Sequence, residues 1–400
     1  MYQWSDEHLM IRDALRRFVD EEIRPHREKL EYGDLPPYDL LRKLFATFGM
    51  DAMQRDSFRK RIEKERRATE RADPAAAEDP RRSERDRGNS GGSAMLMLPI
   101  IELCRCSPGM VTALGVSMGL TSAAIMSRGT IEQKERWALD LLTLDAVGAW
   151  AITEPNSGSD AFGSMQSTAR RDGEEYVLNG SKTFITNGPY ADTIVFICKL
   201  VGDEGEPPEQ RRVVSFVLER GMPGLEQSKP LRKMGLHSSP TGQLFLTDVR
   251  VGRDRLLGET EEAPGGGRDA AKATFTMERT GVAAMALGIV DRCLELSVQY
   301  AKDRVQFGKP IGEYQLIQLK LAKMEVARLN IQNLVFRQLE MAEAGLAMNL
   351  TEASACKLYA AQATMEVCLE AVQLFGGNGY MAEYQVEQLC RDAKVLQIYG

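Results

Sequence analysis

The apolar positions at the start of the chain recur with the spacing of one helix face. Ser5 is placed to cap this helix, and Asp6 and Glu7 would complement the helix dipole in its first turn. The apolar positions are Ile11, Leu15, Phe18 and Val19. Pro25 is expected to end the run, because proline lacks the N–H that a helix interior requires. The chain is therefore predicted to begin with an amphipathic helix.

The middle of the chain, from about Val147 to Gly258, alternates short β-prone runs with turn residues. Asn179-Gly180 lies between two such runs, residues 176–178 and 183–186, and an Asn-Gly pair in this setting is the strongest short signal for a β-hairpin. Further strands are predicted at residues 194–201, 213–218 and 245–251. This region is expected to form a β domain.

The third region is predicted to be helical, after a linker rich in glycine, proline and glutamate at residues 259–268. One helix places apolar residues on a single face, and these are Ile317, Leu321, Met324, Ile331 and Val335. Asn349 and Glu352 have the spacing of a capping box for the next helix. That helix, residues 351–375, is apolar nearly all round and is expected to be buried within a bundle.

The order of helices, sheet and helices predicts a multi-domain α+β protein. We expect an N-terminal helical domain over residues 1–146, a central β domain over 147–258 and a C-terminal four-helix bundle over 259–400. A charged insertion, residues 55–93, interrupts the first domain: 12 basic and 9 acidic residues fall among the 34 from Arg55 to Gly88. Such a stretch cannot bury a core, so we interpret it as a solvated excursion, helical at most in part. A basic docking arm is the alternative, and the mixed signs disfavour it.

Composition narrows the range of functions. A formal net charge of −6 disfavours nucleic-acid binding, which depends on basic surfaces. Seven scattered cysteines and three histidines leave little for a metal site, and we expect reduced, buried cysteines in a cytoplasmic protein. No membrane span or secretion signal is expected, because the apolar runs are short and the first helix is rich in acids.

Three motifs carry candidate chemistry. The first, residues 152–160, is a small-residue loop whose hydroxyls and amides suit a phosphate or a heterocycle. The second, residues 304–310, offers an arginine and a glutamine for a pyrophosphate and a phenylalanine to cover an aromatic ring. The third, residues 373–380, is a glycine-rich break after a buried helix. Taken singly, each could equally be an ordinary turn or helix end.

In this order and at these separations, the motifs resemble the acyl-CoA dehydrogenase family. The resemblance covers residues 100–400 strongly and the first helix weakly, with shorter matches at residues 105–120, 133–137, 179–182, 234–236 and 391–394. It implies FAD bound between the β domain and the bundle, partly across a subunit interface, in a homotetramer or dimer. It also implies an acyl-CoA substrate and an electron-transferring flavoprotein as the partner that takes up the electrons.

The resemblance assigns cofactor contacts to residues of all three motifs and of the β domain. Thr153 and Ser159 would contact the flavin and its phosphates, Phe184 would stack on the isoalloxazine and Thr186 would hydrogen-bond flavin N5. Arg304, Gln306 and Phe307 would reach the FAD of a neighbouring subunit, and Gln373 and Gly377 would contact its adenosine part.

The chain departs from the family pattern at the catalytic base. Where members of the family have Tyr-Glu-Gly-Thr, this chain has Tyr399-Gly400, so glycine stands at the position of the catalytic glutamate. The sequence ends before the Gly-Thr-Ser segment and final helix of the family, so we expect a bundle that is shortened relative to the family. Glu278 is the predicted replacement base, as in isovaleryl- and long-chain-type members, with Phe275, Arg279 and Tyr399 at the substrate. Without the resemblance, Glu278 would be interpreted as a first-turn acid favoured by the helix dipole.

The leading hypothesis is therefore FAD-dependent α,β-dehydrogenation of acyl-CoA thioesters. Glu278 would take the α proton while the β hydride moves to flavin N5. An acyl-CoA oxidase or a flavin monooxygenase of the same fold is an alternative that the oxygen reactivity of the reduced flavin would separate. A non-catalytic protein that binds acyl-CoA or FAD is a third. By the same resemblance, residues 51–93 replace an apolar stretch, rich in proline and glycine, that forms one wall of the family's acyl pocket, so the sequence does not specify the length of the acyl group.

Overall fold

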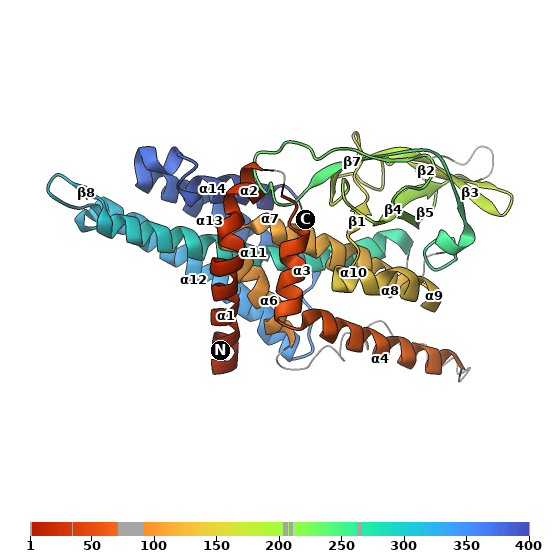
Figure 1. Cartoon of the computed structure of the whole chain (residues 1–400), viewed down its shortest axis with the longest axis horizontal. Helices are drawn as coiled ribbons and strands as arrows, with labels where there is room; N and C mark the ends of the chain where they lie inside the picture. Colours follow the sequence, from red (N-terminus) through yellow and green to blue (C-terminus); the bar gives the residue numbers. More distant parts are fainter. Residues whose placement is uncertain are drawn as a thin grey trace.

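The computed structural model describes residues 2–33, 35–70, 92–202, 207, 211–262 and 266–399. In the range 92–202 the side chains are described from residue 94 onward, and in the range 266–399 from residue 278 onward. Long helices form one part of the molecule, and a curled sheet lies at one end of it (Figure 1). The predicted fold class, N-terminal helices followed by a β domain and a C-terminal helical bundle, is confirmed. Most of the charged insertion, residues 71–91, lies outside the described residues.

The N-terminal helices pack against the C-terminal bundle in one shared hydrophobic core. Ser5 caps α1 as predicted, because its Oγ accepts a hydrogen bond from the His8 N–H at 3.2 Å. The helix then passes through a π-helical turn, Val19–Ile23, and a 3₁₀ turn that contains Pro25. The helices are α1 (Asp6–Phe18), α2 (Arg27–Tyr32), α3 (Tyr38–Thr47), α4 (Met50–Glu70), α6 (Gly92–Cys104), α7 (Pro108–Gly115), α8 (Ala123–Arg128), α9 (Ile131–Gln133) and α10 (Leu139–Thr143).

Helix α4 contains the first part of the charged insertion and contacts the rest of the protein along one side only, as far as the described residues show. Phe58 and Ile62 are buried in a cluster with Trp137 of the following helices. Lys134 donates to Glu65 at 2.6 Å, and Arg66 pairs with Glu135 at 2.7 Å. The described part of the insertion is therefore a helix packed along one side, and α4 projects from the body of the molecule (Figure 1).

One sheet in the order β1-β4-β2-β3-β7-β6, with β5 on the other side of β4, forms the β domain. Strand β4 is buried on both faces: Ile194 and Phe196 point into the sheet's own core, whereas Val195 and Ile197 pack against α8–α10. This is why residues 194–201 read as a continuous apolar run. The strands are β1 (Gly148–Ala151), β2 (Thr168–Asp172), β3 (Glu175–Thr186), β4 (Thr193–Leu200), β5 (Val213–Glu219), β6 (Leu225–Gln227) and β7 (Thr241–Gly252).

The predicted hairpin at Asn179-Gly180 is wrong, because β3 runs straight through this pair. The turn lies earlier, where Gly173 has a φ of 63° between β2 and β3. Gly180 instead occupies a β-bulge with a φ of 153°. A Cβ at this position would lie 2.2 Å from the Ser167 Oγ, so glycine is required for the close approach of Ser167 and not for chain reversal.

The C-terminal helices are α11 (Gly266–Asp303), α12 (Gln315–Glu343), α13 (Leu350–Phe375) and α14 (Gln385–Lys394), and the hairpin β8 (Val305–Gln306) and β9 (Lys309–Pro310) joins α11 to α12. The predicted capping box of α13 is confirmed, because the Asn349 side chain accepts from the Glu352 N–H at 2.9 Å. Helix α13 packs in the bundle against α11, α12 and α14, as expected. Its apolar surface is not fully covered within one chain, because Leu358 and Leu369 are 58% and 54% exposed.

One helical run, Pro108–Arg128, is long and apolar enough to cross a membrane by length and composition. Half of its apolar window is buried inside the protein, where it packs on β1 and α10. A core helix passes the same test, so this run is weak support for a span.

Candidate functional site

The loop at residues 152–160 lies beside β3, where two predicted site regions meet. The Thr183 N–H donates to the Thr153 carbonyl at 2.9 Å, and this bond joins the loop to the strand. Thr153 is partly buried and Ser159 is exposed. The loop therefore presents hydroxyls next to the residues of β3 that follow Thr183.

A buried ion pair between Lys182 and Glu154, which the sequence did not predict, holds this loop against β3. The Lys182 ammonium donates to the Glu154 carboxylate at 2.8 Å and to the Ile152 carbonyl at 3.0 Å. Glu154 also accepts from the backbone N–H groups of Gln166 and Ser167 at 2.6 and 2.9 Å. Both residues stand in segments that resemble the family, Glu154 in residues 152–160 and Lys182 in residues 179–182, but only the fold shows that they pair.

Phe184 and Thr186 lie at a second irregularity of β3. The register of β3 against β7 shifts between Lys182 and Ile185, and Phe184 has a φ of 56°. A bulky residue in this conformation is strained, and its ring is 69% exposed. Thr186 is partly exposed opposite Thr241. The structure thus brings Thr153, Phe184 and Thr186 together, with an exposed aromatic ring beside polar groups.

Asn187 fixes the end of β3 to the helices. It is buried and adopts a φ of 64°. Its Nδ2 donates to the carbonyls of Ala113 in α7 and Gly148 in β1 at 2.9 and 2.8 Å, and its Oδ1 accepts from the Tyr38 hydroxyl at 2.9 Å. These bonds place α7 directly next to Thr186, and nothing in the local sequence pattern indicated them.

Glu278 lies on α11, near the start of the part whose side chains are described. Burial raises the pKa of Glu278 above its ordinary value, and the cations Arg279 and Lys357 act in the opposite direction. Arg279 is held in place by a 2.8 Å hydrogen bond to the Ser354 Oγ of α13. Burial and Arg279 lower the pKa of Lys357. Sequence reasoning missed Lys357, which lies one helical turn after Ser354.

Tyr399 connects Glu278 to α7. Its hydroxyl donates to the Met285 Sδ at 3.5 Å, and burial and the Glu278 carboxylate raise its pKa. The Thr112 side chain of α7 lies beside this hydroxyl. Since α7 also contacts Asn187, this one helix joins the end of β3, where the residues predicted at the flavin lie, to Tyr399 beside the predicted base. The side chain of Phe275 and all of Gly400 lie outside the described residues.

The remaining predicted residues lie at the far end of the bundle. Arg304, Gln306 and Phe307 are on or beside the β8–β9 hairpin, and Phe307 is 94% exposed with a φ of 52°. Gln373 and Gly377 are exposed at the end of α13, and the stacked rings of Tyr300 and Phe375, 4.0 Å apart, join this end to α11.

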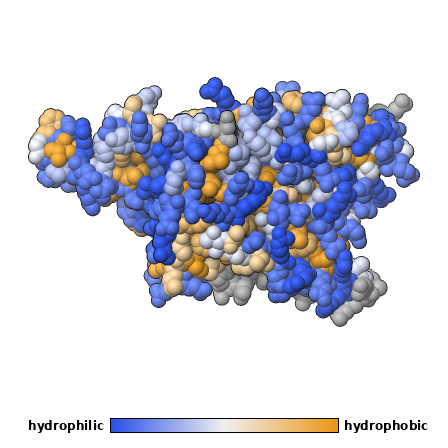
Figure 2. Space-filling view, in the orientation of Figure 1, coloured by the Kyte–Doolittle hydropathy of each residue, from blue (hydrophilic) through white to orange (hydrophobic). Residues whose placement is uncertain are grey.

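The hairpin lies at the opposite end of the molecule from the sheet (Figure 1), and apolar side chains gather on that surface (Figure 2). One chain therefore does not bring these five residues to Thr153 or Phe184. The predicted set forms two half-sites, one on the β3 side and one at the hairpin end.

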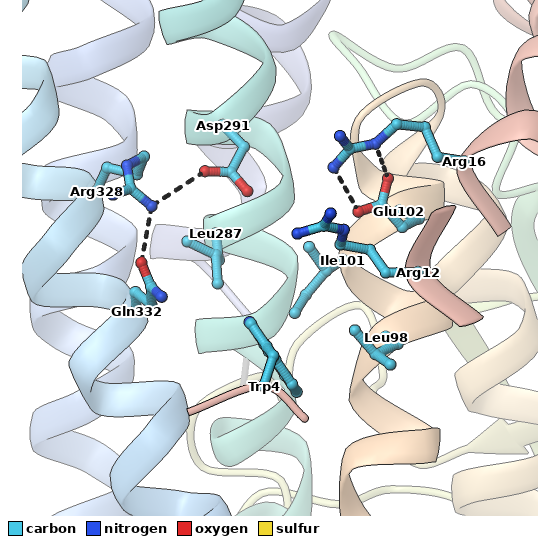
Figure 3. Close-up of a pocket in the computed structure, with 10 residues that line it drawn as sticks. All are labelled: Trp4, Arg12, Arg16, Leu98, Ile101, Glu102, Leu287, Asp291, Arg328 and Gln332. Atoms are coloured by element: carbon cyan, nitrogen blue, oxygen red, sulfur yellow. Dashed lines mark hydrogen bonds and ion pairs between the residues drawn. The ribbon is translucent and has the colours of Figure 1, made fainter. Parts of the chain in front are cut away.

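A cavity of about 120 Å³ between α1, α6, α11 and α12 is separate from both half-sites (Figure 3). Its arginines are held by acids: Arg16 makes a two-pronged pair with Glu102, and Arg328 lies 3.8 Å from Asp291. Burial raises the pKa of Asp291 to about 6. None of the predicted site residues lines this cavity, which joins the first helix to the bundle.

Two family profiles match the chain. Residues 149–249 match "Acyl-CoA dehydrogenase, middle domain", and residues 265–400 match "Acyl-CoA dehydrogenase, C-terminal domain". An acyl-CoA dehydrogenase of Bacillus subtilis is 35% identical over 396 residues, which is 99% of this chain and 94% of that protein.

Solved structures give the same result. Butyryl-CoA dehydrogenase from Megasphaera elsdenii superposes with a TM-score of 0.81 at 32% identity, over 100% of this chain and 95% of that one. An acyl-CoA dehydrogenase from Bacillus anthracis, solved in complex with FAD, has a TM-score of 0.75 at 27% identity, over 99% of this chain and 64% of that one.

Proposed function

Because this chain belongs to the acyl-CoA dehydrogenase family, whose members are oxidoreductases acting on the CH–CH bond of acyl-CoA thioesters, we propose that it dehydrogenates acyl-CoA thioesters between the α and β carbons, with FAD as cofactor and Glu278 as base. The observation that carries the proposal is the position of Glu278. Its largely buried carboxylate lies next to Tyr399 and two cations, and Tyr399 lies beside the same helix, α7, that Asn187 at the end of β3 contacts.

The residues on the β3 side fit a flavin. An exposed aromatic ring on a strained bulge, with Thr153 and Thr186 on the same stretch of surface, suits a planar heterocycle that needs both stacking and hydrogen bonds. When bound, FAD accepts the hydride that leaves the β carbon. Thr153 and Ser159 would hold the flavin and its phosphates, Phe184 would cover the ring and Thr186 would donate a hydrogen bond to it.

Glu278 would take the α proton. A base must be ionised to act, and Arg279 and Lys357 oppose the effect of burial on its pKa. The 2.8 Å bond from Arg279 to Ser354 fixes one of these cations. Tyr399 would close the pocket beside the carboxylate, and the surrounding helices would exclude water. We expect the rate of flavin reduction to fall as the pH drops through the raised pKa of Glu278.

The hairpin half-site is proposed to serve a neighbouring copy of this chain. Arg304, Gln306 and Phe307 are too far from Thr153 within one chain, and Phe307 is almost fully exposed. The bundle also exposes leucines and a valine on its outer helices, which a second copy would cover. These are Leu316, Leu319, Val326, Leu329, Leu358 and Leu369. We propose a homodimer or homotetramer, with an electron-transferring flavoprotein as the protein that takes electrons from the reduced enzyme.

The test is to mix the FAD-loaded protein with a panel of acyl-CoA thioesters without oxygen and to measure reduction of the flavin as the loss of its absorbance. Glu278→Gln should retain FAD and bind acyl-CoA yet lose about 10²–10⁴ in the rate of reduction. Glu226→Gln, the same change at an exposed carboxylate of the sheet, is the matched control and should behave like the parent protein. Normal bleaching in Glu278→Gln would overturn the assignment of the base.

A further inference from the structure

The cavity between the first helix and the bundle has charged groups of opposite sign on two facing walls (Figure 3). Asp291 points into it from α11, and Arg12 points into it from α1 on the other side. Their side chains are 23% and 31% exposed, so a solute in water can reach both groups. The cavity is therefore an accessible site, and it lies apart from the residues proposed to bind FAD and the acyl group.

The Asp291 carboxylate accepts no hydrogen bond from the described residues. Its one ion pair among them is with Arg328, and the 3.8 Å between the Asp291 Oδ1 and the Arg328 Nη1 is too long for a hydrogen bond. Arg328 instead donates from its Nε and Nη2 to both oxygens of Glu325, at 2.7 and 2.8 Å. Burial raises the pKa of Asp291 only to about 6, so the group is ionised at neutral pH. A largely buried carboxylate without donors is costly, and an occupant that supplies a donor would remove this cost.

Arg12 is the least neutralised cation of the cavity. Its Nε and Nη2 donate to the Asp13 Oδ1 at 2.9 and 2.7 Å, but the Asp13 side chain is 59% exposed, and an ion pair in contact with water attracts weakly. Arg16 differs, because both oxygens of its partner Glu102 accept from it and Glu102 is only 2% exposed. The Nη1 of Arg12 has no partner among the described residues and is left to donate to an occupant.

The walls between these two charges are apolar and set the size of the occupant. They are formed by the Trp4 ring and by Leu98, Ile101 and Leu287. The cavity has a volume of about 120 Å³, and an apolar cavity of about 150 Å³ is known to hold benzene, a molecule of six carbons. Since this cavity is open to solvent, its occupant has roughly six to eight non-hydrogen atoms and an apolar body.

We propose that this cavity binds a small α-amino acid with an apolar side chain, whose ammonium donates to Asp291 and whose carboxylate accepts from Arg12. An amine would leave Arg12 unmatched, and a carboxylate would leave Asp291 without a donor. The side chain would contact Trp4 and the aliphatic walls. Because the two charged residues belong to α1 and α11, the bound amino acid would hold the first helix to the bundle. The proposal does not depend on the proposed dehydrogenation.

The experiment is calorimetric titration of the full chain, with FAD added, by L-alanine and L-valine. Isobutylamine and isovalerate, which are valine without its carboxylate and without its ammonium, are titrated in parallel. The amino acids should bind with a Kd of about 1 mM or tighter. The amine and the acid should bind about tenfold more weakly or worse, because each leaves one charge unmatched. No saturable binding of either amino acid, or equal binding of the amine or the acid, would overturn the site.

Two conservative variants test the two charges separately. Asp291→Asn should weaken valine binding about tenfold or more without weakening that of isovalerate, and Arg12→Gln should weaken valine binding without weakening that of isobutylamine. Asp303→Asn on α11 and Arg17→Gln on α1 are the matched controls, since both residues are exposed and do not line the cavity. Arg12 is partly exposed, so Arg12→Gln keeps the test available if Asp291→Asn does not fold. Undiminished valine binding in either folded variant would overturn the site.

Thermal unfolding gives a second readout that is independent of turnover. A ligand that binds only the folded chain raises its Tm, so saturating valine should raise the Tm of the parent protein and of both control variants. The same concentration should leave the Tm of Arg12→Gln and Asp291→Asn nearly unchanged. An equal rise in all of them would show a general effect of the solute and would overturn the site. Failure of acyl-CoA thioesters to bleach the flavin would count against the proposed function and would leave these results unaffected.

Discussion

Glu154 and Lys182 form an ion pair 2.8 Å apart that is almost completely removed from solvent, 4% and 0% exposed. Burial alone would raise the pKa of Glu154, but the Lys182 ammonium and the surrounding donors lower it, so the carboxylate stays charged. Burial lowers the pKa of Lys182. The pair joins β3 to the loop that carries Thr153 and Ser159, and it therefore sets the geometry of the proposed flavin surface.

We expect Lys182→Met to destabilise the protein by roughly 3–5 kcal/mol, because it leaves a buried carboxylate without its cation. The double variant Lys182→Met/Glu154→Gln should recover much of this loss, since neither charge then remains. Urea unfolding measures the stability, and FAD binding reports the shape of the loop. If the double variant is as unstable as the single one, the packing of Lys182 matters and its charge does not.

The junction between α2, the loop at residues 228–241 and α14 should make stability pH-dependent through His237. Both ring nitrogens face acceptors: Nδ1 is 2.7 Å from the Glu31 carbonyl and 3.1 Å from its carboxylate, and Nε2 is 2.7 Å from the Lys233 carbonyl. Both nitrogens can donate only in the imidazolium. The bond to Glu31 accordingly raises the pKa of His237 to about 9.

Because this folded-state pKa lies above the unfolded value of 6.5, the stabilisation is complete below pH 6.5 and is lost as the pH rises through 9. We expect a loss of roughly 2 kcal/mol across this window, allowing for partial exposure. Burial also brings the pKa of Asp392 to about 7 and that of Lys233 to about 8, so the parent profile is mixed. The difference between the parent and His237→Gln isolates the imidazole, and parallel profiles would contradict the assignment.

Gly180 should not tolerate alanine. Its φ is 153°, and the Ser167 Oγ lies 2.2 Å from the position that an alanine Cβ would occupy, which leaves no room. Ser167 also belongs to the Glu154 network. We expect Gly180→Ala to cost about 2 kcal/mol or more and to weaken FAD binding. Gly119→Ala is the control, since a Cβ there meets nothing within 4 Å. Equal thermal stability of the two variants would argue against the close approach.

Arg304→Ala should lose FAD and assembly together. The arginine is exposed in the single chain and is proposed to bind the cofactor of a neighbouring copy. Removing a charge-assisted contact should cost about 1.5–3 kcal/mol, a factor of roughly 10–100 in FAD affinity. Lys302→Ala, an exposed cation two residues earlier on α11, is the control. Flavin occupancy and light-scattering mass measure the two effects, and a variant that keeps both would exclude a bridging role.

The sequence by itself determined the order of a helical region, a β region and a second helical region, and the approximate limits of a few elements such as β4, β5 and α13. Capping boxes at Ser5 and Asn349 and the apolar run of β4 are local signals, because each depends on neighbours within a few residues. The Asn179-Gly180 pair shows where such signals fail. The same dipeptide serves a hairpin or a bulge, and the choice depends on Ser167, which approaches Gly180 from outside its own strand.

Only the tertiary structure decided which site residues meet. Motif order indicated a common cofactor, but only the fold shows that α7 joins the end of β3 to Tyr399 beside Glu278, and that the hairpin residues lie at the other end of the bundle. The buried partners Glu154 and Lys182, and the cation Lys357 beside Glu278, had no local signature. Such relationships join residues far apart in the chain, and their energies depend on burial and distance, which a linear pattern does not specify.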